Sequence, residues 1–408
     1  MSDAEVVVQS NAVTEDNPEI LAARERGIPV ILRSAMLNQL MRLKYGIGIA
    51  GTHGKTTVTN MTAKILGEGR LDPTVILGGR LSSPGSHARL GSGEYIVAEA
   101  CEAFGSFLDL HPTIALATNV EDDHLDHYGT LTAVQAAFRS YLERVPFYGT
   151  AIVCWDDPFL RKLAKDLKVR KVSYGLEAGA DVSAEGLERS PEGCSFQLVQ
   201  NGRKLGFVDL KVPGRHNVQN ALGAAAVALE VGVEPEAVAR GLAAFRGTAR
   251  RFELKGEVAG IKVVDDYGHH PTEVAATLKA ARDCCRGRVL AVFQPHLYSR
   301  TRDHAEGFGR ALALADTALI LPIYPAREKP IPGVTQDWLL DMARRAAGGK
   351  GRFVAVGSLE EAAMSAVSEA VSGDMILTIG AGDIHKAAGL VLENLSAKTA
   401  STPQGVRA

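Results

Sequence analysis

The sequence predicts an α/β protein built on parallel sheets, and three observations lead to this fold class. Short apolar runs typical of buried strands alternate with helical patterns along almost the whole chain, the order expected when crossover helices connect parallel strands. Hydrophobic residues make up 46% of the 408 residues, which is enough to bury a sizeable core. A glycine-bearing turn after one strand opens directly into a helix, and in such sheets ligands bind at the carboxyl ends of the strands.

Length and charge limit the classes of protein to consider. A chain of 408 residues suggests two or three domains. Its 45 basic and 47 acidic residues give a formal net charge of −2, so no general attraction for nucleic acid or for an anionic membrane is expected. No apolar run approaches the roughly 18 residues of a membrane-spanning helix. The five cysteines are an odd number without metal-type CxxC spacing, which favours reduced thiols in a cytoplasmic protein.

Residues 1–45 alternate between strand and helix patterns. Strands are expected near residues 5–9 and 28–32. Between them, Asn17 followed by Pro18 predicts the start of a helix, because asparagine is a good cap and proline suits the first helical position.

Residues 46–245 are predicted to form one central domain. Short buried strands are expected at 95–98 and 113–118, each followed by polar residues. Asn201-Gly202 separates two strand patterns and is a strong hairpin signal. The central domain is therefore expected to carry an antiparallel appendage beside its parallel sheet.

Residues 246–395 form a second alternating unit, and residues 396–408 are predicted to be a disordered polar tail. Polar clusters directly follow four of the strands in this unit, which indicates a binding face at one edge of its sheet. The expected strands are 261–264, 289–293, 318–321, 353–356 and 375–379.

The turn after the strand at 47–50 has the features of a phosphate-binding loop. Gly51 and Gly54 allow backbone N–H groups to approach an anion closely, and the following helix adds the partial positive charge of its N-terminus. Lys55 is suited to the outer phosphates and the Thr56 hydroxyl to Mg²⁺. The strict GxxxxGK[ST] pattern is not met, since Ile49 stands in place of its first glycine. A glycine turn without a ligand is the alternative.

Three further segments of the central domain have both a functional and an ordinary structural interpretation. Glu99 and Glu102 at a strand end are either metal ligands or a solvated acidic turn. Residues 118–127, with His124 among carboxylates, suit a divalent cation or form a plain polar loop. Residues 213–220 either cap a helix or present amides to a base or ribose.

In the C-terminal unit two polar segments stand out. They are residues 250–253, Arg-Arg-Phe-Glu, and residues 265–271, Asp-Asp-Tyr-Gly-His-His-Pro. A helix begins at this second segment, so His269 to Glu273 also fit a capping arrangement without any catalytic role.

The order of these segments closely resembles that of the Mur ligase family, from residue 4 to about residue 395. Two segments, DDYGHHPTE and FQPHLYSRT, resemble the alanine-adding members in particular. The segments that carry the resemblance are GTHGKTT, VAEACE, TNVEDDHLDHYG, PFYG, PGRHNVQNAL, FRGTARRFE, VVDDYGHHPTE, VFQPHLYSRTR, YPAREKPIPG and IGAGD.

The resemblance implies three domains. Residues 1–45 resemble the back half of a Rossmann-like domain for the UDP-substrate, without the glycine-rich loop with which that domain opens in the family. A central P-loop-type ATPase domain at 46–245 and a C-terminal Rossmann-like domain for the amino acid at 246–395 would follow. We therefore expect weakened binding of the UDP-substrate. Cys101 also departs from the family, which usually has aspartate there.

The implied activity is ATP-dependent ligation of L-alanine to UDP-N-acetylmuramate in peptidoglycan precursor synthesis. The lactyl carboxylate would be activated as an acyl phosphate, and ADP and phosphate would be released. ATP and Mg²⁺ are the implied cofactors. The other implied partners are these small molecules alone, with no nucleic acid and no membrane insertion, for a monomer or homodimer in the cytoplasm.

Site residues follow from the resemblance, position by position. The catalytic residues would be Lys55, Glu99 and His124, and Thr56, Glu99 and His124 would hold Mg²⁺. Tyr267, His269, His296 and Arg300 are expected to contact the amino acid and the muramoyl end. ATP would be bound by Gly51, Thr52, His53, Gly54, Lys55, Thr56, Thr57, His216, Asn217, Asn220, Arg251 and Asp266.

Other functions remain open at this point. A murein-peptide recycling ligase, which joins a tripeptide to the same sugar nucleotide, shares the phosphate loop and the ATP chemistry. A folate polyglutamylating ligase fits the C-terminal segments less well. The incomplete first domain also allows an inactive ATP-binding fragment. A nicotinamide-dependent dehydrogenase is disfavoured, because no GxGxxG with an acidic residue about 20 positions later is present.

Overall fold

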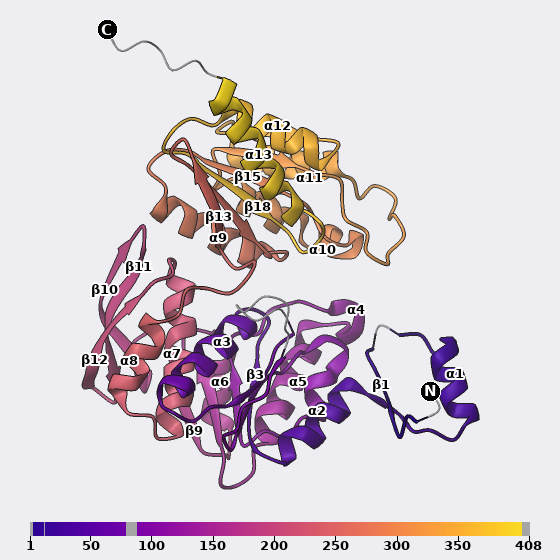
Figure 1. Cartoon of the computed structure of the whole chain (residues 1–408), viewed down its shortest axis with the longest axis vertical. Helices are drawn as coiled ribbons and strands as arrows, with labels where there is room; N and C mark the ends of the chain where they lie inside the picture. Colours follow the sequence, from indigo (N-terminus) through magenta and orange to yellow (C-terminus); the bar gives the residue numbers. More distant parts are fainter. Residues whose placement is uncertain (1–2, 12, 79–87, 402–408) are drawn as a thin grey trace. The chain divides into compact units, whose positions relative to one another are not determined.

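The computed structural model describes residues 3–11, 13–78 and 88–401, and its chain divides into two compact units (Figure 1). The first unit consists of Met1–Leu187, Ser195–Leu210 and Asn217–Phe245. The second consists of Glu188–Cys194, Lys211–His216 and the chain from Arg246 onward.

The N-terminal segment forms a small parallel pair of strands with two helices. Strands β1 (Val7–Gln9) and β2 (Val30–Leu32) pair in parallel, and helices α1 (Pro18–Glu25) and α2 (Arg33–Arg42) follow them. The side chain of Asn17 accepts a hydrogen bond of 2.9 Å from the Glu19 N–H. The predicted helix start at Pro18 is therefore confirmed, whereas both strands are shorter than expected.

A ten-stranded sheet dominates the first unit. Its strand order is β12-β11-β10-β9-β8-β7-β3-β6-β4-β5, and all pairings from β9 through β6 to β4 are parallel. The elements are β3 (Tyr45–Ala50), α3 (Lys55–Glu68), β4 (Thr74–Ile76), β5 (Ala88–Arg89), β6 (Tyr95–Glu99), η1 (Ala103–Asp109), β7 (Ile114–Ala117), α4 (Leu125–Tyr128), α5 (Leu131–Glu143), β8 (Thr150–Cys154), α6 (Pro158–Asp166), β9 (Lys171–Tyr174), β10 (Val182–Ser190), β11 (Gly193–Gln200), β12 (Arg203–Leu210), α7 (Arg215–Glu230) and α8 (Pro235–Ala243).

The predicted hairpin closes one end of this sheet. Strands β11 and β12 are neighbours and are joined by Asn201 and Gly202 alone. Both residues have positive φ, at 51° and 77°, the combination that a tight two-residue hairpin requires and that Asn-Gly adopts readily. The expected antiparallel appendage is confirmed.

The second unit is a three-layer α/β/α structure. Its sheet has the order β13-β14-β18-β15-β16-β17, with β13 antiparallel and the remaining pairs parallel. The elements are β13 (Glu253–Val258), β14 (Ile261–Asp266), α9 (Pro271–Cys284), β15 (Val289–Phe293), α10 (Tyr298–Leu312), β16 (Thr317–Ile320), α11 (Gln336–Ala347), β17 (Arg352–Ala355), α12 (Leu359–Glu369), β18 (Met375–Ile379) and α13 (His385–Ser401).

The alternation of side chains along β15 shows how the layers form. Val289, Ala291 and Phe293 belong to the core cluster that contains residues of α9, α10 and α11. Leu290 and Val292 belong to the cluster that contains residues of α12 and α13. Because successive strand residues point to opposite faces, a strand that is apolar throughout is covered by helices on both sides.

Two features of the second unit differ from the sequence prediction. Strand β13 was not expected: its sequence ELKGEV is largely polar, as suits an edge strand, and Leu254 is 57% exposed. Helix α13 continues through Ser401, so residues 396–401 are helical rather than part of a disordered tail. The Lys398 ammonium donates to the Val367 carbonyl at 2.7 Å and anchors this last turn. Residues 402–408 lie outside the described part of the chain.

Within the described residues, no helix has both the length and the apolar character needed to cross a bilayer.

The contact between α3 and α8 offers a test of packing in the first unit. A Cβ added at Gly241 of α8 would lie 2.6 Å from the Ile65 Cα of α3. We expect Gly241→Ala to destabilise the protein by about 1–3 kcal/mol, because the two helices would have to move apart. Urea unfolding measures the change.

Gly67→Ala is the matched control on α3. A Cβ there meets nothing within 4 Å, so we expect a gain of about 0.5–1 kcal/mol from the higher helix propensity of alanine. Equal effects of the two substitutions would contradict the described packing.

Candidate active site

Three loops meet at one edge of the ten-stranded sheet because of the strand register. Strand β3 lies between β6 and β7, with Ile49 opposite Glu99 and Ala50 opposite Ala117. All three strands run in the same direction, so the segments that follow them start side by side. These segments are the predicted phosphate loop, the Glu99–Glu102 segment and the loop that contains His124.

Two glycines of the first loop occupy positions that no other residue fits. Gly51 and Gly54 have φ values of 142° and 85°. A Cβ at Gly51 would lie 1.7 Å from the Thr118 Oγ1, and a Cβ at Gly54 would lie 2.6 Å from the Asn220 Oδ1. The loop backbone thus approaches its neighbours closely, as an anion-binding loop must approach a phosphate.

The loop is held in this shape by the segment after β7. The His53 N–H donates to the Asn119 Oδ1 at 2.8 Å, and the Asn119 side-chain amide donates back to the His53 carbonyl at 3.2 Å. The Thr118 hydroxyl donates to the same carbonyl at 2.5 Å. Thr118 and Asn119 were not among the predicted site residues, although the polar Thr-Asn pair directly after a buried strand was a usable signal.

Lys55 is enclosed by protein acceptors. Its ammonium donates to the Gly51 carbonyl at 2.6 Å, the Thr52 carbonyl at 3.0 Å and the Glu102 carboxylate at 2.9 Å. Burial lowers the pKa of Lys55, but the neighbouring Glu102, Cys101 and Glu99 outweigh that effect, so the net pKa lies above its ordinary value. The ammonium therefore stays charged, as a phosphate ligand must be.

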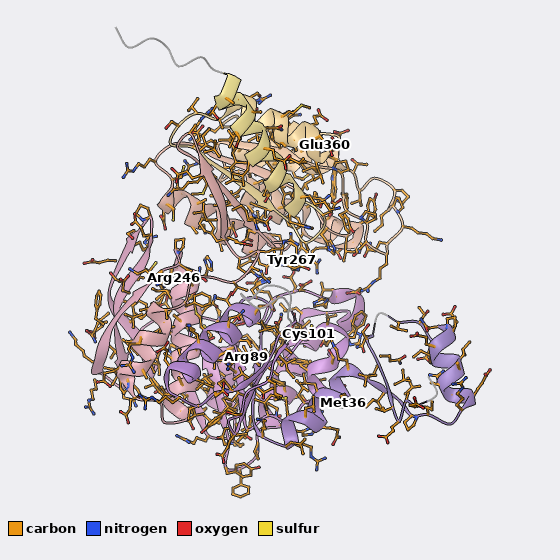
Figure 2. All side chains as sticks on the ribbon, viewed as in Figure 1. Met36, Arg89, Cys101, Arg246, Tyr267 and Glu360 are labelled. Carbon is orange, nitrogen blue, oxygen red and sulfur yellow. The ribbon has the colours of Figure 1, made fainter. Side chains whose placement is uncertain are left out.

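Glu99, the last residue of β6, and Glu102 have different surroundings. They lie on either side of Cys101 in the sequence, and Cys101 is labelled in Figure 2. The Thr56 hydroxyl donates to the Glu99 Oε2 at 3.0 Å. Glu102 is only 3% exposed and pairs with Lys55. The alternative of a solvated acidic turn is therefore wrong for Glu102.

The hydroxyl of Thr56 and the carboxylate of Glu99 form a donor set that fits Mg²⁺, which prefers hard oxygen ligands. The third predicted ligand, His124, lies beside the other carboxylate, with its Nε2 3.6 Å from the Glu102 Oε1. His124 also has a left-handed backbone, with φ 55°. Such strain in a residue other than glycine occurs often at functional sites.

Helix α7 contributes two of the predicted amides. It begins at Arg215, so Asn217 lies inside the helix and does not cap it. The Asn220 side-chain amide donates to the Asn217 Oδ1 at 3.4 Å, and Asn220 also lies against Gly54. Asn220 is thereby placed next to the phosphate loop, with Asn217 as its hydrogen-bond partner.

His216 belongs to the second unit and packs on Gly214. A Cβ at Gly214, where φ is 98°, would lie 2.6 Å from the His216 Cε1. Burial, followed by the Arg251 guanidinium, lowers the pKa of His216 to about 4, against a smaller opposite effect of Glu273. The imidazole is therefore neutral at pH 7 and can both donate and accept a hydrogen bond.

Asp266 organises the edge of the second sheet where β14 ends. Its carboxylate accepts the Phe252 N–H at 2.8 Å and the Gly268 N–H at 2.7 Å. Burial raises the pKa of Asp266, with Arg251 opposing the shift. Arg251 itself pairs with Glu273 at 3.2 Å.

Tyr267, labelled in Figure 2, lies beneath two guanidinium groups. The Cζ of Arg250 is 4.8 Å and that of Arg251 is 5.3 Å from the ring centroid. Arg250 was not predicted as a site residue. Its Nε donates to the buried Asp265 at 3.1 Å, so it also ties the turn before β13 to β14.

The predicted substrate residues of the second unit form a row of aromatic rings. The His269 ring lies 5.3 Å from Tyr267 and 6.3 Å from His296, which stacks on Tyr324 at 5.7 Å. The guanidinium of Arg300 approaches the His296 Nδ1 at 3.5 Å. Tyr324 was not assigned from the sequence, although it belongs to one of the polar clusters that follow the strands.

The capping alternative is confirmed for His270. The Thr272 N–H donates to the His270 Nδ1 at 3.4 Å, and Glu273 accepts the His270 N–H at 3.3 Å. The same glutamate accepts the His269 N–H at 2.9 Å. Glu273 therefore orients this segment, and the His269 Nδ1 lies 3.0 Å from the Tyr267 carbonyl and 3.2 Å from the Glu273 carboxylate.

Comparison with known proteins gives consistent matches. The Mur ligase middle domain matches residues 49–228, the glutamate ligase domain of Mur ligases matches 250–382, and a further Mur ligase family domain, described as catalytic, matches 1–45. The chain is 46% identical to UDP-N-acetylmuramate–L-alanine ligase of Solibacter usitatus, over 97% of this chain and 84% of that protein.

Solved structures show the same likeness. UDP-N-acetylmuramate-alanine ligase of Thermotoga maritima has a TM-score of 0.81 and 28% identity, covering 97% of this chain and 86% of that one. A murein peptide ligase of Psychrobacter arcticus has a TM-score of 0.68 and 25% identity, covering 100% and 87%. The expected α/β fold is confirmed by this likeness.

The depressed pKa of His216 predicts a loss of stability in acid. The ordinary histidine pKa is about 6.5. Below that pH, His216 is protonated in the unfolded chain but stays neutral in the folded protein until the pH approaches 4. Stability should fall by up to about 3 kcal/mol between pH 6.5 and pH 4 on this account.

Urea unfolding of His216→Asn should therefore depend less on pH over this window than wild type. The exposed His111 provides the control, since His111→Asn should leave the pH profile unchanged. A His216→Asn profile identical to wild type would contradict the assigned environment.

Proposed function

The chain belongs to the Mur ligase family, and we propose that it uses ATP to join L-alanine to UDP-N-acetylmuramate, releasing ADP and phosphate. This reaction is a step of peptidoglycan precursor synthesis. The observation that carries the proposal is the glycine loop before α3, whose carbonyls hold the Lys55 ammonium and beside which Thr56 pairs with Glu99. The choice of L-alanine is supported by the 46% identity to an L-alanine ligase along 97% of the chain.

The chemistry explains why such a loop is needed. A carboxylate is a poor acyl donor, because its oxygen is a poor leaving group. Transfer of the terminal phosphoryl group of ATP to the lactyl carboxylate would give an acyl phosphate. The alanine amine would then attack the carbonyl carbon, and phosphate would leave from the tetrahedral intermediate. Phosphoryl transfer depends on positioning and charge neutralisation rather than on a covalent enzyme intermediate.

The residues of the first unit would take the following roles. The N–H groups of the loop and Lys55 would bind the triphosphate, with the lysine on its outer oxygens. Thr56 and Glu99 would hold Mg²⁺, and His124 would help hold a second ion near the substrate carboxylate. Bound there, the metal neutralises phosphate charge. Asn217 and Asn220 would contact the nucleotide.

The residues of the second unit supply the remaining proposed roles. Arg251, Asp266 and the neutral His216 would contact the nucleotide. The ring row of Tyr267, His269 and His296, with Arg300, would contact the amino acid and the muramoyl end. A guanidinium is suited to the carboxylate of the incoming amino acid, because it binds such a group with two hydrogen bonds.

Release of phosphate by the purified chain is the direct test. With Mg²⁺, ATP and UDP-N-acetylmuramate present, we expect release that requires L-alanine. Release with the tripeptide L-alanyl-γ-D-glutamyl-meso-diaminopimelate but not with L-alanine would indicate the recycling ligase instead. Absence of release with either amine donor would contradict ligase activity of this chain.

Lys55→Ala tests the phosphate loop itself. We expect the rate to fall by at least about 100-fold, because the only side-chain cation of the described loop would be removed from the developing charge. Lys64→Ala, on the exposed side of the same helix, should retain the wild-type rate. Circular dichroism and thermal melting check that the variant folds, and a folded, fully active Lys55→Ala protein would refute the assignment.

A further inference from the structure

The Lys55 ammonium is saturated by the protein itself. An ammonium has three N–H donors, and three acceptors surround this one: two carbonyls of its own loop and the Glu102 carboxylate. Both oxygens of Glu102 lie 2.9 Å from the Lys55 Nζ. The lysine can therefore reach a phosphate only by giving up at least one of these contacts.

Of the three acceptors, the Glu102 carboxylate is the one that a phosphate can most readily replace. The two carbonyls belong to the loop whose shape is fixed by Thr118 and Asn119. Glu102 lies on a different segment, 47 residues away in sequence. Its charge is also of the same sign as that of a phosphate, so both ligands compete for the same cation.

Glu102 is held in place independently of Lys55. The Tyr128 hydroxyl donates to the Glu102 carbonyl at 2.6 Å, and η1 begins at the next residue. The side chains of Lys55 and Glu102 are only 12% and 3% exposed. Leaving either charge without a partner at such depth would be costly, so the nucleotide-free loop needs a resident anion.

We propose that Glu102 is a positioning residue that occupies the place of a phosphate: its carboxylate holds Lys55 in the nucleotide-free protein and releases it when a triphosphate binds. The inference rests on the proposed binding of ATP. It assigns to Glu102 a role separate from that of Glu99, whose carboxylate contacts Thr56 rather than the lysine.

If the triphosphate displaces Glu102 from Lys55, removing the charge of Glu102 should strengthen ATP binding. An ion pair that only stabilises the fold does not predict this. Glutamine keeps the shape of Glu102 and one acceptor oxygen but removes the charge. Lys55 would then form only a charged-to-neutral contact in the empty protein, and the triphosphate would displace a weaker competitor. We expect Glu102→Gln to bind ATP about tenfold more tightly than wild type.

Calorimetric titration of the nucleotide-free proteins with ATP in EDTA measures this affinity without any contribution from a metal site. Thermal melting should show a lower midpoint for empty Glu102→Gln than for empty wild type, and a larger rise on addition of ATP. Glu121→Gln is the matched control. It also removes one negative charge beside the loop, since the Glu121 carboxylate lies 3.6 Å from the His53 Nε2.

Tighter binding by Glu102→Gln but not by Glu121→Gln would support the exchange. Unchanged or weaker binding by Glu102→Gln would overturn it, and so would equal tightening by both variants, since that would reflect general charge alone. Wild type that binds ATP neither in EDTA nor with Mg²⁺ would refute the proposed function instead.

If Glu102→Gln does not fold, Glu102→Asp replaces it in the same titration. Aspartate keeps the charge but is one methylene shorter, so its contact with Lys55 is weakened. Tighter ATP binding is again expected, and unchanged or weaker binding would overturn the proposal.

Discussion

The candidate site depends on the position of β3 between β6 and β7 in a parallel sheet. A strand has two neighbours, and the register places Glu99 and Ala117 beside the last two residues of β3. Loops that leave parallel strands at one edge must share a small space. The close approaches at Gly51 and Gly54 follow from this crowding, because there is no room for a side chain between the loop and Thr118 or Asn220.

The crowding at that edge also determines how the charged side chains pair. Water is largely excluded from Lys55 and Glu102, so each charge must find a partner among the protein groups that the strands bring close. The same edge collects the Thr56 hydroxyl and the Glu99 carboxylate. The ammonium of Lys55, the hydroxyl of Thr56 and the carboxylates of Glu99 and Glu102 thus already bind one another, and an anionic ligand and its metal can replace these contacts.

In the second unit, too, polar groups meet where the strands of the sheet end. Asp266 ends β14, and its carboxylate fixes both the turn at Phe252 and the backbone at Gly268. Gln294, directly after β15, donates to Asp383 at 2.8 Å beyond the end of β18. The polar residues after the strands therefore bind one another, and they also hold Arg250, which donates to the Asp265 carboxylate and to the Gly380 carbonyl.

Much of this protein was decided by local sequence. Alternating strand and helix patterns, the Asn-Gly hairpin and the Asn17 cap are local signals, because each depends on residues within one element. The glycines of the phosphate loop and the lysine after them are equally local. The resemblance to the Mur ligase family extended these signals to residues that lie far apart, such as Glu99 and His124.

Only the tertiary structure decided which groups meet. Local periodicity tells which face of a strand is buried but not which strand lies beside it, so it cannot show that Glu102 is the partner of Lys55 or that Asn220 lies against Gly54. The polar edge strand β13 was missed because its pairing with β14, rather than its own pattern, makes it a strand. The sequence therefore determined the elements and the chemistry available, and packing determined the partners.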